Sequence, residues 1–206
     1  MQPTKLRGII PPMITPLKGD DELDREGAVR LTEHLVAGGV HAIFLLGTTG
    51  EAQSLTYRLR YEFVELVCRQ VAGRVPVLVG VTDTAFIESI RLAEHAAKCG
   101  AVGVVAAPPY YFAPSQQELI EYYTALADAL PLPLYLYNMP SHVKVFLEPA
   151  TVKTLASHPN IVGLKDSSAN MTYFQTLLYH LGDNPDFSLY VCLLYTSPSP
   201  RDKRQS

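Results

Sequence analysis

The chain has 206 residues, of which 48% are hydrophobic, and this suits one globular domain with a sizeable core and excludes a disordered or fibrous protein. Its 17 basic and 20 acidic side chains give a formal charge of −3, so no basic surplus favours nucleic acid as a partner. Three scattered cysteines and the absence of a long apolar run argue against a disulfide framework, a zinc motif, an export signal and a membrane span, and they predict a cytoplasmic location.

Short apolar runs rich in β-branched residues recur along the chain and predict seven strands, whose starts are 26 to 35 residues apart. Segments 24–37 and 56–71 between them have helical periodicity, glycines follow the expected helices, and Ser115 can cap a later one. Strands that are apolar on both faces and alternate with helices predict an α/β fold with a parallel sheet. The expected strands are 8–14, 42–46, 77–81, 103–107, 134–137, 161–164 and 187–191.

Polar residues follow several different strands and the first loop lacks a GxGxxG motif, which favours a (β/α)8 TIM barrel over an open doubly wound sheet. A barrel needs eight strands and about 250 residues. We therefore expect residues 1–191 to form an incomplete barrel, truncated after about strand 7. Residues 192–206, which contain Ser-Pro-Ser-Pro and have no helical period, are interpreted as a non-native, artefactual tail.

The carboxyl ends of barrel strands are the expected place for catalytic groups. The second strand is followed by GTTGE, where Gly47, Thr48 and Thr49 could bind an anion or simply form a tight turn. The fourth strand is followed by PPYY. On the fifth strand, alternation places Tyr135 and Tyr137 on one side, either in the core or in a site.

The sixth strand ends in a lysine, Lys165, directly after four apolar residues. Desolvation disfavours an ammonium group and favours a neutral amine that can attack a carbonyl to form a Schiff base. The competing interpretation is a lysine that reaches solvent or pairs with Asp166. An iminium on Lys165 would act as an electron sink in aldol chemistry, with Tyr137 moving a proton through a threonine hydroxyl and the Thr48–Thr49 loop holding a carboxylate.

The motifs GTTGE, PPYY, YNMP and GLKDSS, in this order, make residues 7–191 resemble the dihydrodipicolinate synthase and N-acetylneuraminate lyase family. The resemblance implies that Lys165 forms a Schiff base with pyruvate, that Tyr137 donates or accepts the proton, and that Thr48 and Tyr111 complete a proton relay. It implies that Thr49, with the loop at Gly47, holds the pyruvate carboxylate. It also implies that Tyr111 enters a neighbouring subunit of a homodimer or homotetramer, and no cofactor is expected.

His142 stands where lysine-biosynthetic members of the family carry an arginine. A histidine cannot form the bidentate hydrogen bonds by which an arginine binds a carboxylate. We therefore expect a lyase, a class I aldolase, that acts on a 2-keto-3-deoxy sugar acid or a related substrate and handles pyruvate with an aldehyde or 2-keto acid. The alternatives are 4-hydroxy-tetrahydrodipicolinate synthase, N-acetylneuraminate lyase, and a non-catalytic keto-acid-binding barrel. The truncated chain itself is expected to be inactive.

A metal-dependent aldolase is the less favoured mechanism, because the six histidines form no HxH or HExxH pair. His34 and His95 fall within expected helices, where solvated positions are predicted. No metal ligands are therefore assigned.

Overall fold

The computed structural model describes residues 6–192, which contain a six-stranded parallel sheet of order β3-β4-β5-β6-β7-β8 and a small antiparallel hairpin, β1–β2. Each strand of the parallel sheet pairs with the next strand along the chain. The elements are β1 (Leu17–Gly19), β2 (Glu22–Leu23), α1 (Arg25–Ala37), β3 (Ile43–Leu45), η1 (Ala52–Ser54), α2 (Tyr57–Val71), β4 (Val77–Gly80), α3 (Phe86–Lys98), β5 (Gly103–Ala106), α4 (Gln116–Ala129), β6 (Leu134–Asn138), α5 (Pro140–Val143), α6 (Pro149–Leu155), β7 (Ile161–Asp166), α7 (Met171–Leu181) and β8 (Ser188–Val191).

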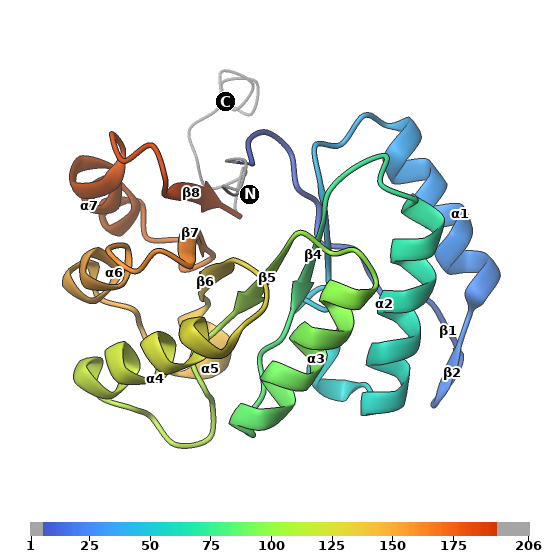
Figure 1. Ribbon diagram of the computed structural model, residues 1–206, viewed down its shortest axis with the longest axis horizontal. Coiled ribbons are helices and arrows are strands. Elements are labelled where there is room, and N and C mark those ends of the chain that lie inside the picture. The colour runs from blue at the N-terminus through green and yellow to red at the C-terminus, as the bar shows by residue number, and fades with distance from the viewer. Residues whose placement is uncertain (1–5, 193–206) are drawn as a thin grey trace, which may run out of the picture.

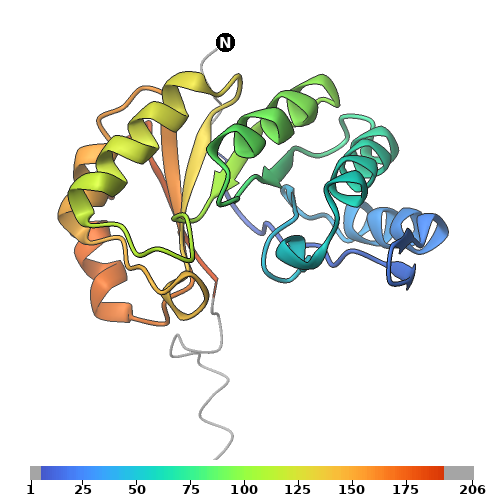
Figure 2. The same cartoon turned by 90° about the horizontal axis from the view of Figure 1, so that it is seen from below.

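The sheet curls, and the longer helices follow one another around its outside (Figures 1 and 2). Neighbouring helices pack in the order α1, α2, α3, α4, α6, α7. Within residues 6–192, β3 and β8 are the two edges of the sheet. The predicted α/β fold is confirmed, and its form is the greater part of a (β/α)8 barrel that is not closed by the described residues.

Local signals place the helix starts where the sequence predicts them. Asp24 caps α1 by accepting a hydrogen bond from the backbone of Gly27 at 3.0 Å, and Thr56 caps α2. Ser115 and Glu118 form a reciprocal capping box at the start of α4. These side chains satisfy backbone N–H groups that have no partner within the helix, so the helix boundaries follow from short sequence patterns.

The strand expected at 8–14 is wrong: within this segment only Pro12 makes a ladder contact, an isolated parallel bridge to Phe44. Pro11 and Pro12 have no N–H group, so the segment cannot sustain a regular ladder. It still runs beside β3, because Met13 donates to the carbonyl of Phe44 at 2.9 Å and Phe44 donates to that of Pro11 at 3.0 Å. The expected tail lies outside the described residues, except for Cys192.

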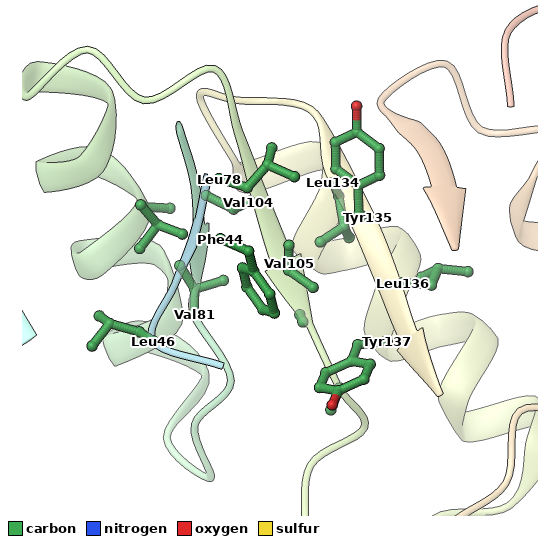
Figure 3. Packing of buried hydrophobic residues seen from close by; sticks show 14 of the residues in the cluster. Phe44, Leu46, Leu78, Val81, Val104, Val105, Leu134, Tyr135, Leu136 and Tyr137 are labelled. Carbon is green, nitrogen blue, oxygen red and sulfur yellow. The ribbon is translucent and has the colours of Figure 1, made fainter. Parts of the chain in front are cut away.

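The inner face of the sheet is lined by alternate residues of each strand. Figure 3 shows Phe44, Val105 and Tyr137 gathered on one side, with Leu136 pointing away from them. The ring of Tyr135 lies over Gly163, where an added Cβ would come within 2.8 Å of it. Bare glycine backbone therefore makes room for an aromatic ring inside the barrel. Tyr135 and Tyr137 share a face, as alternation predicts.

Candidate active site

Lys165 and Tyr137 face each other at the carboxyl ends of two neighbouring strands. The register pairs Tyr137 of β6 with Lys165 of β7. The Lys165 amine (Nζ) lies 4.4 Å from the centre of the Tyr137 ring and 4.8 Å from that of Phe44. Tyr137 is buried, whereas Lys165 is half-buried. Two aromatic faces beside the amine favour a positive charge at this point, whether an ammonium or an iminium.

Thr48, in the turn after β3, contacts the same tyrosine. Its hydroxyl lies 3.3 Å from the hydroxyl of Tyr137, and either group could donate. The motif does form a tight turn, because Gly50 donates to the carbonyl of Gly47 and Glu51 donates to that of Thr48. The amides of Thr48 and Thr49 have no hydrogen-bond partner among residues 6–192. The turn and anion-binding interpretations are therefore compatible.

The turn after β3 approaches β4 closely. Leu46 has a left-handed backbone (φ 54°), which is uncommon for a residue with a side chain. An added Cβ on Gly80 would lie 2.2 Å from the Leu46 carbonyl oxygen. The absence of a side chain at Gly80 thus lets the chain turn and carry Thr48 towards Tyr137.

A cavity of about 440 Å³ opens beside Tyr137, a size that suits a small-molecule site. Its lining includes Gly47, Thr48, Glu51, Tyr110 and His142. A second cavity of about 540 Å³ is lined by Lys165 and by segments 6–12 and 188–192. Phe44 and Val105 line both cavities, and the pair of Lys165 and Tyr137 lies where they meet.

Tyr111 and Thr49 are not brought to the cavity within one chain. Tyr111 is 88% exposed, has a positive φ of 92°, and packs its ring against that of the exposed Phe112, its one ring contact within residues 6–192. The neighbouring phenol, Tyr110, lines the cavity instead, and burial raises its pKa. Thr49 is exposed and lines neither cavity. In the sequence, the one signal for a role of Tyr110 in the cavity is its position directly after the pair of prolines.

His142 lies on the short helix α5 at the cavity wall, where its Nδ1 is 2.9 Å from the hydroxyl of Ser141. The expected solvated position of His95 is wrong, because its Nε2 is 3.1 Å from the carbonyl oxygen of Tyr61 and its ring packs on that of Tyr61.

A buried ion pair supports the loop after β4. Arg60 and Asp83 are 8% and 7% exposed at their side chains, with Nη1 and Oδ2 3.0 Å apart. Asp83 also accepts from Tyr57 and from the backbone of Ala85, and burial with the Asp83 charge raises the pKa of Tyr57. Each charge is therefore compensated and hydrogen-bonded. No sequence motif marks this pair, because its members are 23 residues apart.

Residues 6–192 contain no group of three or more His, Cys, Asp or Glu side chains placed to hold a metal ion. No helix in this described part has the length and hydropathy that crossing a bilayer requires.

The curled parallel sheet, with a lysine and a tyrosine paired at the carboxyl ends of adjacent strands, defines the class of protein, a (β/α) barrel that the described residues leave incomplete, with a candidate site at its rim. The family follows from comparison with known proteins. Residues 5–192 match the model of the Dihydrodipicolinate synthetase family, and the chain belongs to this family.

Three solved structures illustrate the similarity. A dihydrodipicolinate synthase from Bacteroides thetaiotaomicron is 59% identical with a TM-score of 0.87, covering 90% of this chain and 62% of that one. YagE from Escherichia coli K12, in complex with pyruvate, is 38% identical with a TM-score of 0.85, covering 89% and 62%. A 2-keto 3-deoxygluconate aldolase from Picrophilus torridus is 30% identical with a TM-score of 0.85, covering 91% and 67%.

Curated relatives named 4-hydroxy-tetrahydrodipicolinate synthase are also similar, and the chain spans between 56% and 62% of their length. The similarity therefore concerns a part of each relative, the part that carries Lys165 and Tyr137 here.

Proposed function

We propose that the protein containing this chain is a pyruvate-dependent class I aldolase that forms its Schiff base on Lys165. One observation carries the proposal: Lys165 and Tyr137 are register partners on adjacent strands, with the amine over the Tyr137 ring and the Tyr137 hydroxyl beside that of Thr48. A nucleophile, a proton carrier and a relay thus stand together at one rim. The pyruvate complex of the relative YagE supports pyruvate as a substrate.

The residues have the following roles in cleavage of a 2-keto acid. The Lys165 amine attacks the keto carbon, and loss of water leaves a protonated imine. The hydroxyl of the substrate gives its proton to the Tyr137 oxygen, whose own proton moves towards Thr48. The carbon–carbon bond breaks, its electron pair enters the iminium to form an enamine, and an aldehyde leaves. Thr48 returns its proton to Tyr137, and Tyr137 gives the proton that it took from the substrate hydroxyl to the enamine carbon. Hydrolysis of the imine then releases pyruvate and restores the amine.

The pyruvate carboxylate is assigned to the turn after β3. The amides of Thr48 and Thr49 are without partners among residues 6–192, and Gly47, next to them, lines the 440 Å³ cavity. Thr49 is assigned to this role through its backbone, because its side chain is exposed.

The substrate that is cleaved is proposed to be a 2-keto-3-deoxy sugar acid, which yields pyruvate and a hydroxyaldehyde. Among the described residues that line the 440 Å³ cavity there is no lysine or arginine, and Glu51 is the acidic one. A second carboxylate there would meet a negative charge without a cationic partner, whereas sugar hydroxyls can bond to Glu51 and His142. The similarity to the Picrophilus aldolase supports this class, while the curated synthases support aspartate semialdehyde as the alternative.

We further propose that the assembly is a homodimer or homotetramer in which Tyr111 completes the relay of a neighbouring subunit. Tyr111 and Phe112 are 88% and 82% exposed and adjacent, a pair of apolar rings that a partner could cover. The isolated 206-residue chain is proposed to be inactive, because Lys165 lines a cavity that adjoins the β8 edge.

The test is borohydride reduction in the presence of pyruvate, with the protein expressed from its complete reading frame. Mass spectrometry is expected to find a carboxyethyl adduct on Lys165 and none on Lys153, an exposed lysine of α6. Label on another lysine, or none, would contradict the proposal and favour a non-catalytic keto-acid-binding barrel.

A substrate panel then separates the branches. Cleavage of 2-keto-3-deoxygluconate is expected to exceed both condensation with aspartate semialdehyde and cleavage of N-acetylneuraminate. The variant His142→Arg adds a carboxylate partner at the cavity wall and is expected to raise the use of aspartate semialdehyde. If the unmodified protein prefers aspartate semialdehyde, the assignment of a 2-keto-3-deoxy sugar acid as the substrate is wrong, while the assignment of the Schiff base to Lys165 stands.

A further inference from the structure

Two motif residues that the proposed chemistry leaves unused, Asn138 and Asp166, form a buried pair directly behind the candidate site. Each immediately follows a site residue, Asn138 after Tyr137 on β6 and Asp166 after Lys165 on β7. Because side chains alternate along a strand, the pair lies on the outer face of the sheet. The two residues are 0% and 1% exposed, and the register pairs them with each other as it pairs Tyr137 with Lys165.

The orientation of the Asn138 amide is determined by its two partners. Its Nδ2 donates to Asp166 Oδ1 at 2.9 Å, and its Oδ1 accepts from the backbone N–H of Leu147 at 3.2 Å. The Leu147 amide can only donate, so the side-chain oxygen must face it. The NH₂ group then has to face the carboxylate.

Asp166 is held equally firmly. Its Oδ1 also accepts from the backbone of Ser168 at 3.1 Å, and its Oδ2 accepts from the Ser168 hydroxyl at 3.1 Å. Within residues 6–192 it forms no ion pair, so the pairing of Lys165 with Asp166 that the sequence left open is excluded. The burial of Tyr173 and, second, the charge of Asp166 raise the pKa of that tyrosine.

The ladder between β6 and β7 contains one irregularity, and the site lies beyond it. Leu134 pairs with Ile161, but the next residue, Tyr135, pairs with Gly163, so the ladder shifts by one position inside the pair of strands. Beyond this shift the pairs from Tyr135–Gly163 to Asn138–Asp166 follow in regular order, and a slip by one residue there would turn each side chain to the opposite face. The bond between Asn138 and Asp166 joins the two strands at the last of these pairs, next to the pair of Tyr137 and Lys165.

We propose that the pair of Asn138 and Asp166 positions the Lys165 amine against the Tyr137 hydroxyl for imine formation, an inference that rests on the proposed Schiff base at Lys165. Neither residue touches the cavity, so both are positioning residues. They act by holding the two strand ends in the one register in which amine and phenol face each other.

A double-mutant cycle tests this proposal in the protein expressed from its complete reading frame. Asn138→Asp places two carboxylates face to face, and Asp166→Asn removes the strong acceptor. The double variant Asn138→Asp/Asp166→Asn reverses donor and acceptor: the new carboxylate accepts from Leu147 and from the new amide, whose oxygen accepts from the Ser168 hydroxyl, while the backbone N–H of Ser168 loses its acceptor. We expect the rate of borohydride-trapped imine to fall on the order of 100-fold in Asn138→Asp, as for a displacement of about 1 Å, and to recover in part in the double variant.

The control variant Asn160→Asp shows what the loss of a purely structural hydrogen bond does to stability and to the trapping rate. Asn160 donates to the carbonyl of Ala127 at 2.8 Å from the opposite end of β7. Its variant is expected to unfold at lower urea concentration but, while folded, to trap pyruvate at the unmodified rate with an unchanged pH profile.

The outcomes separate the two proposals. Absence of an adduct on Lys165 in the unmodified protein overturns both. Suppose that the unmodified protein does form the adduct on Lys165. The positioning role alone is then overturned if Asn138→Asp forms the trapped imine as fast as Asn160→Asp does, or if the double variant recovers no trapping rate. Slow trapping in the folded single variant, a lowered kcat and recovery in the double variant support it.

Discussion

Replacing Gly80 by alanine is expected to displace the turn that carries Thr48. The added Cβ would lie 2.2 Å from the Leu46 carbonyl oxygen and 2.8 Å from its carbon. Both are backbone atoms, so no side-chain rotation relieves the clash. To reach the 3.4 Å at which ordinary contact begins, the two backbones must separate by about 1.2 Å.

A displacement of this size is large enough to disturb the contact between Thr48 and Tyr137. Leu46 already has a left-handed backbone, and Thr48 lies two residues further on, 3.3 Å from the Tyr137 hydroxyl. We expect a loss of about 1–3 kcal/mol in the free energy of unfolding. This corresponds to a decrease of about 2–12 °C in Tm for a protein of this size. We expect a decrease on the order of 100-fold in kcat.

Thermal unfolding and steady-state cleavage assays measure these effects, and Gly19→Ala is the matched control. No heavy atom lies within 4 Å of a Cβ added at Gly19, on the β1–β2 hairpin. If Gly80→Ala melts together with Gly19→Ala and retains the unmodified kcat, the steric argument for Gly80 is wrong.

Tyr137→Phe removes the hydroxyl that faces Thr48 and is expected to lower kcat by about 10²–10⁴-fold while the imine on the lysine can still be trapped; equal kcat would exclude the phenol as the proton carrier. Arg60→Ala leaves the buried Asp83 without its charge partner and is expected to lower the free energy of unfolding, measured in urea, by about 3–5 kcal/mol. A decrease below about 1 kcal/mol, the value typical of surface ion pairs, would show that the pair is solvated. Hydrogen bonds from Arg74 lower the pKa of Glu33 from 4.5 to about 2. Because the folded-state pKa is the lower one, its stabilisation is present above about pH 4.5 and is lost as the pH falls towards 2, so the Tm difference from Glu33→Gln should narrow across this window and a constant difference would contradict the linkage.

The local features of this protein follow from short stretches of its sequence. Helix starts follow from caps such as Asp24 and Ser115, which act within three or four residues of the chain. Alternating apolar strands and helices indicate a parallel barrel, and a lysine after four apolar residues marks Lys165. The motif that places Tyr137 before Asn138 and the one that places Lys165 before Asp166 were both visible.

Which of these residues come into contact depends on how the separate strands pack. Thr48 and Tyr137 are 89 residues apart, and their contact depends on the backbone bend at Leu46 that Gly80 permits. The register between β6 and β7 depends on an irregularity that no local pattern records, and the strand expected at 8–14 is interrupted because prolines cannot donate to a ladder. Caps and strand periods are set by neighbours along the chain, whereas a site is set by how separate strands align, and that alignment is a property of the packed sheet.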